Sequence, residues 1–357
     1  MGILARGMGR VMVAGVIGVC AWGGVVVRAE PPKESEAAEV VGAAKVRAEA
    51  EKVRPLVKTE LARKFLDAAA VLPEPGAVKL YLNRAQRKWL SAEEYEKLPV
   101  EQREGFELRE FDASFYYDTK YGSPVAYART LDLIPGCGAA PAIESLAGKK
   151  IMDIGAGSMG QLRMMSAAGG GAEAVGVDVD PLLTILYRGE KDQGEMPTLD
   201  KGGRGTARMV IGFWPGDEAT KKSVGDGYDL ILSKNTLKAG YLHPSKPADP
   251  RTQLKLGVSD EEYVKALFES LKPAGVVMIY NICPAPSKEG EPFVPWAEGK
   301  CPFPREMWEK TGFRVVKFDE IDDVAVREMF EALGYPVKKK DSGEDDIFAW
   351  YSVFQKK

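Results

Sequence analysis

The stretch that decides the fold is Lys150-Ile-Met-Asp-Ile-Gly-Ala-Gly-Ser-Met-Gly160. A short apolar run ends in an acid, three glycines follow with Gly-x-Gly-x-x-Gly spacing, and a helical pattern begins at Gln161. Glycines allow a tight turn between a strand and a helix, and they let a polar ligand approach the backbone amides where that helix begins. The stretch therefore predicts a strand, a ligand-binding turn and a helix, in that order.

The alternation of strands and helices continues from this stretch to the C-terminus. Ser259 and Glu262 have the spacing of a capping box, which predicts that a helix begins there. Apolar strands separated by helices are typical of a mostly parallel sheet that is covered on both faces. Further strands are predicted at 174–178, 208–213, 228–233, 275–280, 313–317 and 347–354.

Two acids indicate what the glycine turn binds. Asp178 ends the second strand, where a carboxylate can accept hydrogen bonds from the hydroxyls of a ribose. A glycine turn followed by such an acid fits a dinucleotide site equally well. Asp153 separates the two kinds of site, because a carboxylate just before the first glycine repels a pyrophosphate but attracts a ligand that is cationic at that end.

Four elements together resemble the class I S-adenosylmethionine-dependent methyltransferases, over about residues 148–357. They are Asp153-x-Gly155-x-Gly157, Gly176-Val-Asp178, Tyr228-Asp-Leu-Ile-Leu232 and Leu271-Lys-Pro-Ala-Gly275. The resemblance implies a Rossmann-like, doubly wound α/β sheet of seven strands, mostly parallel, whose last strand runs antiparallel. It also implies S-adenosylmethionine as cofactor, with Asp153 and the glycines 155, 157 and 160 at its methionine portion and Asp178 at its ribose.

The resemblance extends to further candidate residues at the same edge of the sheet. Trp214 and Asp217 follow the third strand, near the position of the adenine, although Trp214 would serve equally as a core residue. Ser233 and Asn235 stand where the fourth strand faces the transferred methyl group, and Asn235 is a candidate contact to cofactor or acceptor. His243 is a candidate general base, with an exposed loop histidine as the alternative.

The chain divides into four predicted segments: a signal peptide at 1–29, a linker and helix at 30–76, an accessory cap at 77–147 and the S-adenosylmethionine-binding domain at 148–357. The N-terminal accessory region is expected to be mainly helical. Tyr117 and Tyr121 belong to an aromatic cluster that resembles the cap over the cofactor in methyltransferases acting on small molecules. They are therefore candidate substrate contacts, and packing of the accessory unit against the sheet is the alternative.

The N-terminus has the layout of a secretory signal peptide. Arg6 and Arg10 precede an uncharged stretch at 11–27, and Ala29 offers a small residue before a cleavage site. An exported or envelope-associated protein is expected, in contact with a membrane only if the segment stays uncleaved, and a cytoplasmic one if the start site is misassigned. Export to an oxidising compartment would favour a disulfide bond between Cys283 and Cys301.

Composition narrows the function. The 357-residue chain is 45% hydrophobic and 28% charged, with a net charge of −3 and no basic run suited to nucleic acid. One histidine and widely spaced cysteines argue against a metal site. The predicted function is S-adenosylmethionine-dependent methyl transfer to a small-molecule acceptor, which the sequence does not identify; it also leaves the oligomeric state open. A nicotinamide-dependent oxidoreductase and a non-catalytic binding protein that kept the fold are the alternatives.

Overall fold

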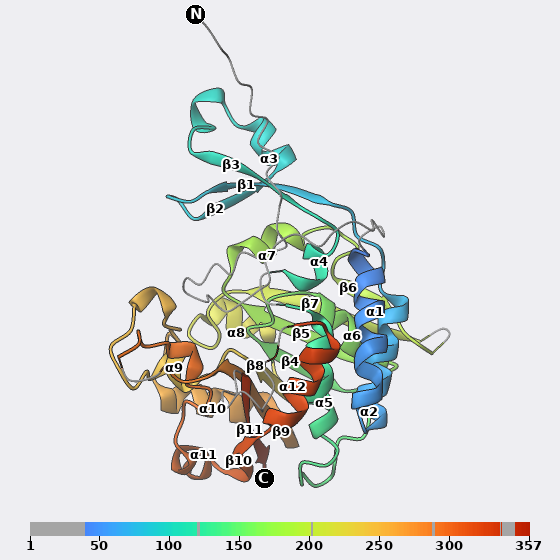
Figure 1. Ribbon diagram of the computed structural model, residues 1–357, viewed down its shortest axis with the longest axis vertical. Coiled ribbons are helices and arrows are strands. Elements are labelled where there is room, and N and C mark those ends of the chain that lie inside the picture. Colours follow the sequence, from blue (N-terminus) through green and yellow to red (C-terminus); the bar gives the residue numbers. More distant parts are fainter. Residues whose placement is uncertain (1–39, 120–121, 201–202, 288–289, 336, 338–346) are drawn as a thin grey trace, which may run out of the picture.

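A computed structural model describes residues 40–119, 122–200, 203–287, 290–335, 337 and 347–357 (Figure 1). Its centre is a sheet of eight strands in the order β10-β11-β9-β8-β4-β5-β7-β6. The strands are β4 (Lys150–Ile154), β5 (Glu173–Asp178), β6 (Gly194–Pro197), β7 (Arg204–Ile211), β8 (Tyr228–Lys234), β9 (Leu271–Pro284), β10 (Phe313–Ile321) and β11 (Ile347–Lys356).

Strand directions confirm a Rossmann-like, mostly parallel sheet. The five strands β7, β5, β4, β8 and β9 run parallel to one another, and the last strand, β11, is antiparallel to both of its neighbours, β9 and β10. The expected seven strands are joined by an eighth, β6, which pairs antiparallel with β7 at the edge. Sequence patterns missed β6 because it is short, mostly exposed and bounded by Gly194 and Pro197, which are unfavourable in strand interiors.

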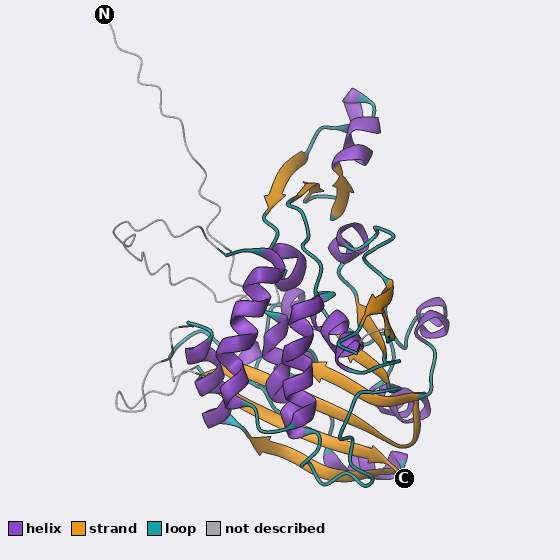
Figure 2. Cartoon of the chain, turned by 90° about the vertical axis from the view of Figure 1, so that its right-hand side faces the viewer, coloured by secondary structure: helices purple, strands orange, loops and turns teal. Residues whose placement is uncertain are grey.

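Two groups of helices cover the two faces of this sheet. Successive side chains of a strand point to opposite faces, so Ile151 and Met152 of β4 enter different apolar clusters. On the first face lie α5 (Tyr127–Leu133), α6 (Gly160–Ala168) and α12 (Asp323–Ala332), and on the second α8 (Glu218–Val224), α10 (Asp260–Ser270) and α11 (Arg305–Thr311). Figure 2 shows helices standing side by side in front of the strands.

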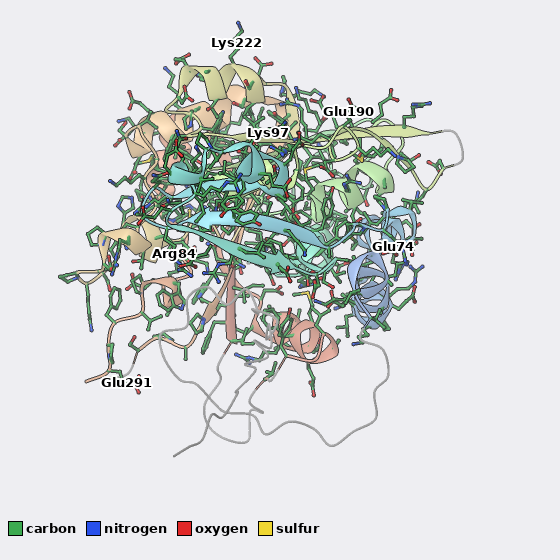
Figure 3. The ribbon with its side chains drawn as sticks, turned by 90° about the horizontal axis from the view of Figure 1, so that it is seen from above. Glu74, Arg84, Lys97, Glu190, Lys222 and Glu291 are labelled. Carbon is green, nitrogen blue, oxygen red and sulfur yellow. The ribbon has the colours of Figure 1, made fainter. Side chains whose placement is uncertain are left out.

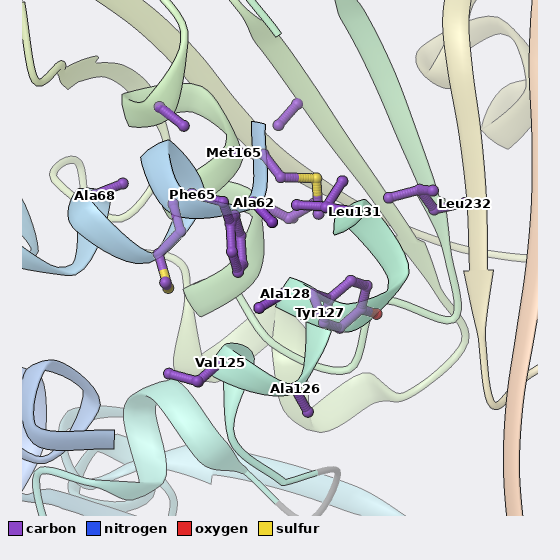
Figure 4. Packing of buried hydrophobic residues seen from close by; sticks show 14 of the residues in the cluster. Ala62, Phe65, Ala68, Val125, Ala126, Tyr127, Ala128, Leu131, Met165 and Leu232 are labelled. Carbon is purple, nitrogen blue, oxygen red and sulfur yellow. The ribbon is translucent and has the colours of Figure 1, made fainter. Parts of the chain in front are cut away.

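The N-terminal helices are built into the first of these faces. Helices α1 (Gly42–Val53) and α2 (Glu60–Asp67) pack on one another, and α2 packs on α5 and α6. Thr59 caps α2 by accepting a hydrogen bond from the backbone of Ala62. Phe65 of α2 is fully buried beside Leu131 of α5 and Met165 of α6 (Figure 4). The part of the predicted linker-and-helix segment that the structure describes therefore contributes to the core of the large sheet.

A second, smaller sheet stands over one edge of the large one. Strands β1 (Val78–Asn83), β2 (Lys88–Ser91) and β3 (Phe106–Phe111) form it in the order β2-β1-β3, all antiparallel, and α3 (Ala92–Lys97) follows β2. Strand β2 contacts α7 (Pro181–Leu186), the helix that follows the carboxyl end of β5. Figure 3 looks down on the small sheet, which thus lies at the carboxyl edge of the parallel strands. The accessory region contains this sheet in addition to its helices.

All three cysteines in the described ranges are free thiols, so the expected bond between Cys283 and Cys301 is not formed. Burial raises the pKa of Cys283 to about 11 and that of Cys301 to about 12. The predicted signal peptide, 1–29, lies outside the described residues. Within those residues, no helix has the length and apolar character needed to cross a membrane.

Candidate cofactor site

The glycine turn between β4 and α6 has a shape that requires its glycines. Gly155 and Gly157 have φ angles of +70° and +66°, which residues with a Cβ rarely adopt. A Cβ on Gly155 would also overlap the side chain of Thr236, which packs directly against it. Gly160 begins α6, and a Cβ there would lie 2.9 Å from Pro124 Cγ. The turn is therefore held tightly between the ends of two strands and the segment that precedes α5.

Asp178 at the end of β5 is connected to the same turn. One of its carboxylate oxygens accepts a hydrogen bond from the Gly157 backbone N–H at 2.9 Å, and the other accepts from the Asp180 N–H at 2.9 Å. Burial raises the pKa of Asp178, and these backbone N–H groups oppose that rise. The carboxylate predicted to bind a ribose thus touches the glycine turn and stays 7% exposed at the sheet edge.

Asp153 at the end of β4 is completely buried. Its Oδ2 accepts a hydrogen bond from Gln161 Nε2 at 3.0 Å, while its Oδ1 lacks a hydrogen-bond partner of good geometry among the described residues. Burial raises the pKa of Asp153 to about 7, and Gln161, Tyr127 and Lys234 act in the opposite direction. A fully buried carboxylate with a single well-formed side-chain hydrogen bond is costly to the fold.

Tyr127 and Lys234 complete the surroundings of Asp153, and neither was predicted from the sequence as a site residue. Asp153 pairs with Leu232 across β4 and β8, so Lys234, two residues further along β8, projects from the same face of the sheet. Lys234 Nζ lies 5.1 Å from the centroid of the Tyr127 ring. The Tyr127 hydroxyl faces the Asp153 carboxylate and is directed away from Phe65 (Figure 4). Strand alternation along 228–234 was the signal that could have found Lys234.

Ser233 and Asn235, which flank Lys234, hold the turn after β8 in shape. Ser233 is fully buried, and its Oγ accepts a hydrogen bond from the Leu237 N–H at 3.1 Å. Asn235 has a φ of +63°, and its Oδ1 accepts from the Ile282 N–H of β9 at 2.6 Å. These atoms orient the strand end that carries Lys234, and in the described part of the chain neither side chain forms a hydrogen bond with Asp153.

Three further candidates lie in other surroundings. Trp214 is buried in the cluster on the second face, with its ring edge-on to Tyr263 at 5.5 Å, so it is a core residue. Asp217 caps α8 by accepting hydrogen bonds from the Ala219 N–H and the Thr220 hydroxyl. His243 Nε2 lies 2.8 Å from Asp260 Oδ2, and its side chain is 48% exposed. None of the three forms a hydrogen bond or ring contact with Asp153, Asp178 or the glycine turn in the described ranges.

The region predicted to be the accessory cap, 77–147, contacts the glycine turn through Thr119. Tyr117 of α4 (Phe115–Asp118) is fully buried, and its hydroxyl donates to the Pro73 carbonyl, which fixes α4 to the N-terminal segment. Tyr121 lies outside the described residues. Thr119 Oγ1 donates to the Gly157 carbonyl oxygen at 2.9 Å. Thr119, the residue that follows α4, therefore lies directly on the turn.

Comparisons with known proteins give distant structural similarity only. No protein-family model matches the sequence, and no curated protein does. A TehB-like SAM-dependent methyltransferase from Corynebacterium glutamicum is 20% identical over 59% of this chain and 82% of its own, with a TM-score of 0.30. Precorrin-6y C5,15-methyltransferase from Geobacter metallireducens is 14% identical over 66% and 89%, with a TM-score of 0.34.

An arsenic(III) S-adenosylmethionine methyltransferase from Chlamydomonas reinhardtii is 14% identical over 59% of this chain and 64% of its own, with a TM-score of 0.31. Similarity at this level carries no activity from those proteins to this one. The fold follows from the strand order and the turn themselves. The mostly parallel sheet, its antiparallel last strand and the glycine turn give this chain a Rossmann-like fold, as its sequence resemblance to the class I S-adenosylmethionine-dependent methyltransferases implies.

Proposed function

We propose that the chain binds S-adenosylmethionine at the carboxyl edge of the large sheet and transfers its methyl group to a small-molecule acceptor. The observation that carries this proposal is Asp153 Oδ1, a buried carboxylate oxygen without a partner of good geometry in the described part of the chain. The amino group of the cofactor's methionine portion is cationic and would satisfy that oxygen. The residues present therefore fit this cofactor.

Each part of the edge has a role in this proposal. Asp153 would hold the ammonium group of the cofactor, and Asp178, the acid at the end of the neighbouring strand, its ribose hydroxyls. Gly155 and Gly157 give the turn its positive φ angles, which bring its backbone to the end of β5 and to Asp178. The cofactor supplies a methyl group on a sulfonium, from which an acceptor nucleophile takes it. The protein contributes alignment and exclusion of water, to which Thr119, placed on the turn, is suited.

The alternative, a site for a dinucleotide such as NADH, is tested by measuring which ligands bind. Asp153 is buried beside the turn, where a pyrophosphate would meet a carboxylate instead of free amides. Titration calorimetry with S-adenosylmethionine, S-adenosylhomocysteine and NADH is expected to show binding of the first two compounds only. If NADH bound and the other two compounds did not, the chain would be a nicotinamide-dependent oxidoreductase instead of a methyltransferase.

A second candidate, a non-catalytic binding protein, has one observation in its favour. Protein groups crowd the site: Thr236 packs on Gly155, and the buried Tyr127 ring stands beside Asp153. His243, the candidate base, is engaged with Asp260. A methyl-transfer assay with labelled cofactor and a panel of small phenols, thiols and carboxylic acids separates the two candidates, because a pure binder retains the cofactor without producing S-adenosylhomocysteine.

We also propose that the chain is exported, on the basis of the signal-like segment 1–29. Mass spectrometry of the N-terminus of the protein from its native host tests this directly. A mature chain beginning near residue 30 supports export with cleavage, and an intact N-terminus in the cytoplasmic fraction argues against export.

A further inference from the structure

Lys234 is a buried charged residue to which neither the fold nor the proposed cofactor contacts assign a role. It is the last residue of β8 and only 9% exposed. Lysine is rarely buried to this extent without a partner of opposite charge. Its position on the sheet indicates which acidic side chain it lies near.

The register of the sheet brings Lys234 to Asp153. Asp153 pairs with Leu232, and Ile154 pairs with Ser233, so Lys234 lies one residue beyond the last pair and diagonally across from Asp153. Residues two apart on a strand share a face, and such diagonal neighbours are within reach of long side chains. The Tyr127 ring, 5.1 Å from Lys234 Nζ, packs between α5 and this edge and turns its hydroxyl to the same carboxylate.

Gln161 of α6 donates a hydrogen bond to Asp153 at 3.0 Å, and three groups from other elements act on the pKa of its carboxyl: Tyr127 of α5, Asp178 of β5 and Lys234 of β8. Gln161 and Tyr127 are neutral donors, and Asp178 is a second acid. Lys234 is therefore the cation among these four. Without it, burial and the neighbouring acid would both favour the protonated, uncharged form of Asp153.

We propose that Lys234 is the positioning residue of the cofactor site, whose ammonium group favours the negatively charged form of Asp153 in the empty site, the form that binds the ammonium group of the ligand. This inference rests on the proposed function, because it assumes that Asp153 meets the methionine portion of the cofactor. A protonated Asp153 would have to lose its proton before it could pair with that ammonium group. Ligand affinity consequently depends on pH, and Lys234 sets the pH at which the affinity is lost.

The test is the pH profile of S-adenosylhomocysteine binding, measured by calorimetry between about pH 5.5 and 8.5. In the wild-type protein the affinity falls as the solution becomes acidic and Asp153 takes up a proton. The substitution Lys234→Met is expected to move the midpoint of this fall upward by about one pH unit or more, because it removes a positive charge near the Asp153 carboxylate. At pH values below both midpoints, each pH unit by which the midpoint moves upward weakens the binding of S-adenosylhomocysteine about tenfold.

Three controls make the result specific. Lys234→Arg keeps the charge and should restore the wild-type midpoint, whereas Lys265→Met, on the exposed side of α10, removes a charge elsewhere and should leave it unchanged. The ligand 5′-methylthioadenosine lacks the amino-acid portion, so its affinity should show no such profile in any variant. Lys234→Gln replaces Lys234→Met if the latter fails to fold.

The outcomes separate this inference from the function on which it rests. An unchanged midpoint in folded Lys234→Met or Lys234→Gln, with S-adenosylhomocysteine still bound, overturns the role of Lys234 and leaves the cofactor site in place. Absence of S-adenosylhomocysteine binding to the wild-type protein across the whole pH range overturns the proposed function and the inference together.

Discussion

Asp153 is the residue at which ligand binding and stability are expected to oppose each other. Burial raises its pKa from 3.8 to about 7, so its ionisation costs free energy of folding. This free-energy cost is absent at pH values below the pKa that Asp153 has in the unfolded chain. It grows as the pH rises toward 7 and is constant at higher pH. A shift of this size corresponds to at most about 4 kcal/mol.

Asp153→Asn should therefore raise the Tm of the unliganded protein, more at pH 8 than at pH 5, because the amide removes the buried charge. Differential scanning calorimetry at the two pH values measures this. Asp229→Asn is the matched control with the opposite sign, since Lys150 N–H and Lys272 bind Asp229 and its pKa is lowered in the folded chain. Equal shifts from Asp153→Asn at both pH values would show that the carboxylate is not protonated on burial.

Asp178 gives a prediction that distinguishes it from Asp153. Its proposed partner is the ribose, which S-adenosylhomocysteine and 5′-methylthioadenosine share. Asp178→Ala should weaken the binding of both ligands by about 1–3 kcal/mol, because buried hydroxyls lose their acceptor. Asp178→Asn keeps one oxygen for the Gly157 N–H and should lose less. Calorimetry showing a loss confined to S-adenosylhomocysteine would place Asp178 at the amino-acid portion instead.

At the scale of elements, the glycine turn and the end of β8 form one packed unit. Gly155→Ala should lower the free energy of unfolding by about 2 kcal/mol or more, through the overlap with Thr236 and the positive φ of Gly155. Adding Thr236→Ala removes the two closest atoms, Oγ1 and Cγ2, while Cβ at 2.7 Å remains, so it should recover part of the loss; the positive φ accounts for about 1 kcal/mol of what is left. Denaturant titration of the wild-type protein, both single variants and the double variant gives a double-mutant cycle. If the losses in the free energy of unfolding are strictly additive, the two residues do not touch.

The elements show why the sequence predicted some features and missed others. Strands such as β4 and β9 are apolar on both faces and flanked by helices, so their patterns are local and were recognised. The glycine turn was equally local. Tyr127 reaches Asp153 only because α5 packs on the first face of the sheet, and Trp214 meets Tyr263 of α10 across the second face. Such contacts depend on how distant elements pack, which single-sequence periodicity does not encode.

At the scale of the whole molecule, the N-terminal helices belong to the large sheet's core. Sequence composition suggested a linker and helix at 30–76, but Phe65, Leu61 and Ala62 are buried between α5 and α6. A chain that lacks residues 40–72 should not fold cooperatively, because those apolar surfaces of α5 and α6 would be exposed. Thermal unfolding followed by circular dichroism tests this, with a chain that begins at residue 40 as the control. A cooperative transition in the shorter chain would show that the domain folds without these helices.

The proposed S-adenosylmethionine site lies at the edge of the large sheet and is built around Asp153. The most direct measurement is calorimetric titration of the wild-type protein and Asp153→Asn with S-adenosylhomocysteine near pH 8. We predict binding to the wild-type protein and at least a tenfold weaker affinity in the variant, because the neutral amide cannot replace the charge-assisted bond to the ligand's ammonium group. No binding to the folded wild-type protein, or equal affinity in the two proteins, would contradict the claim.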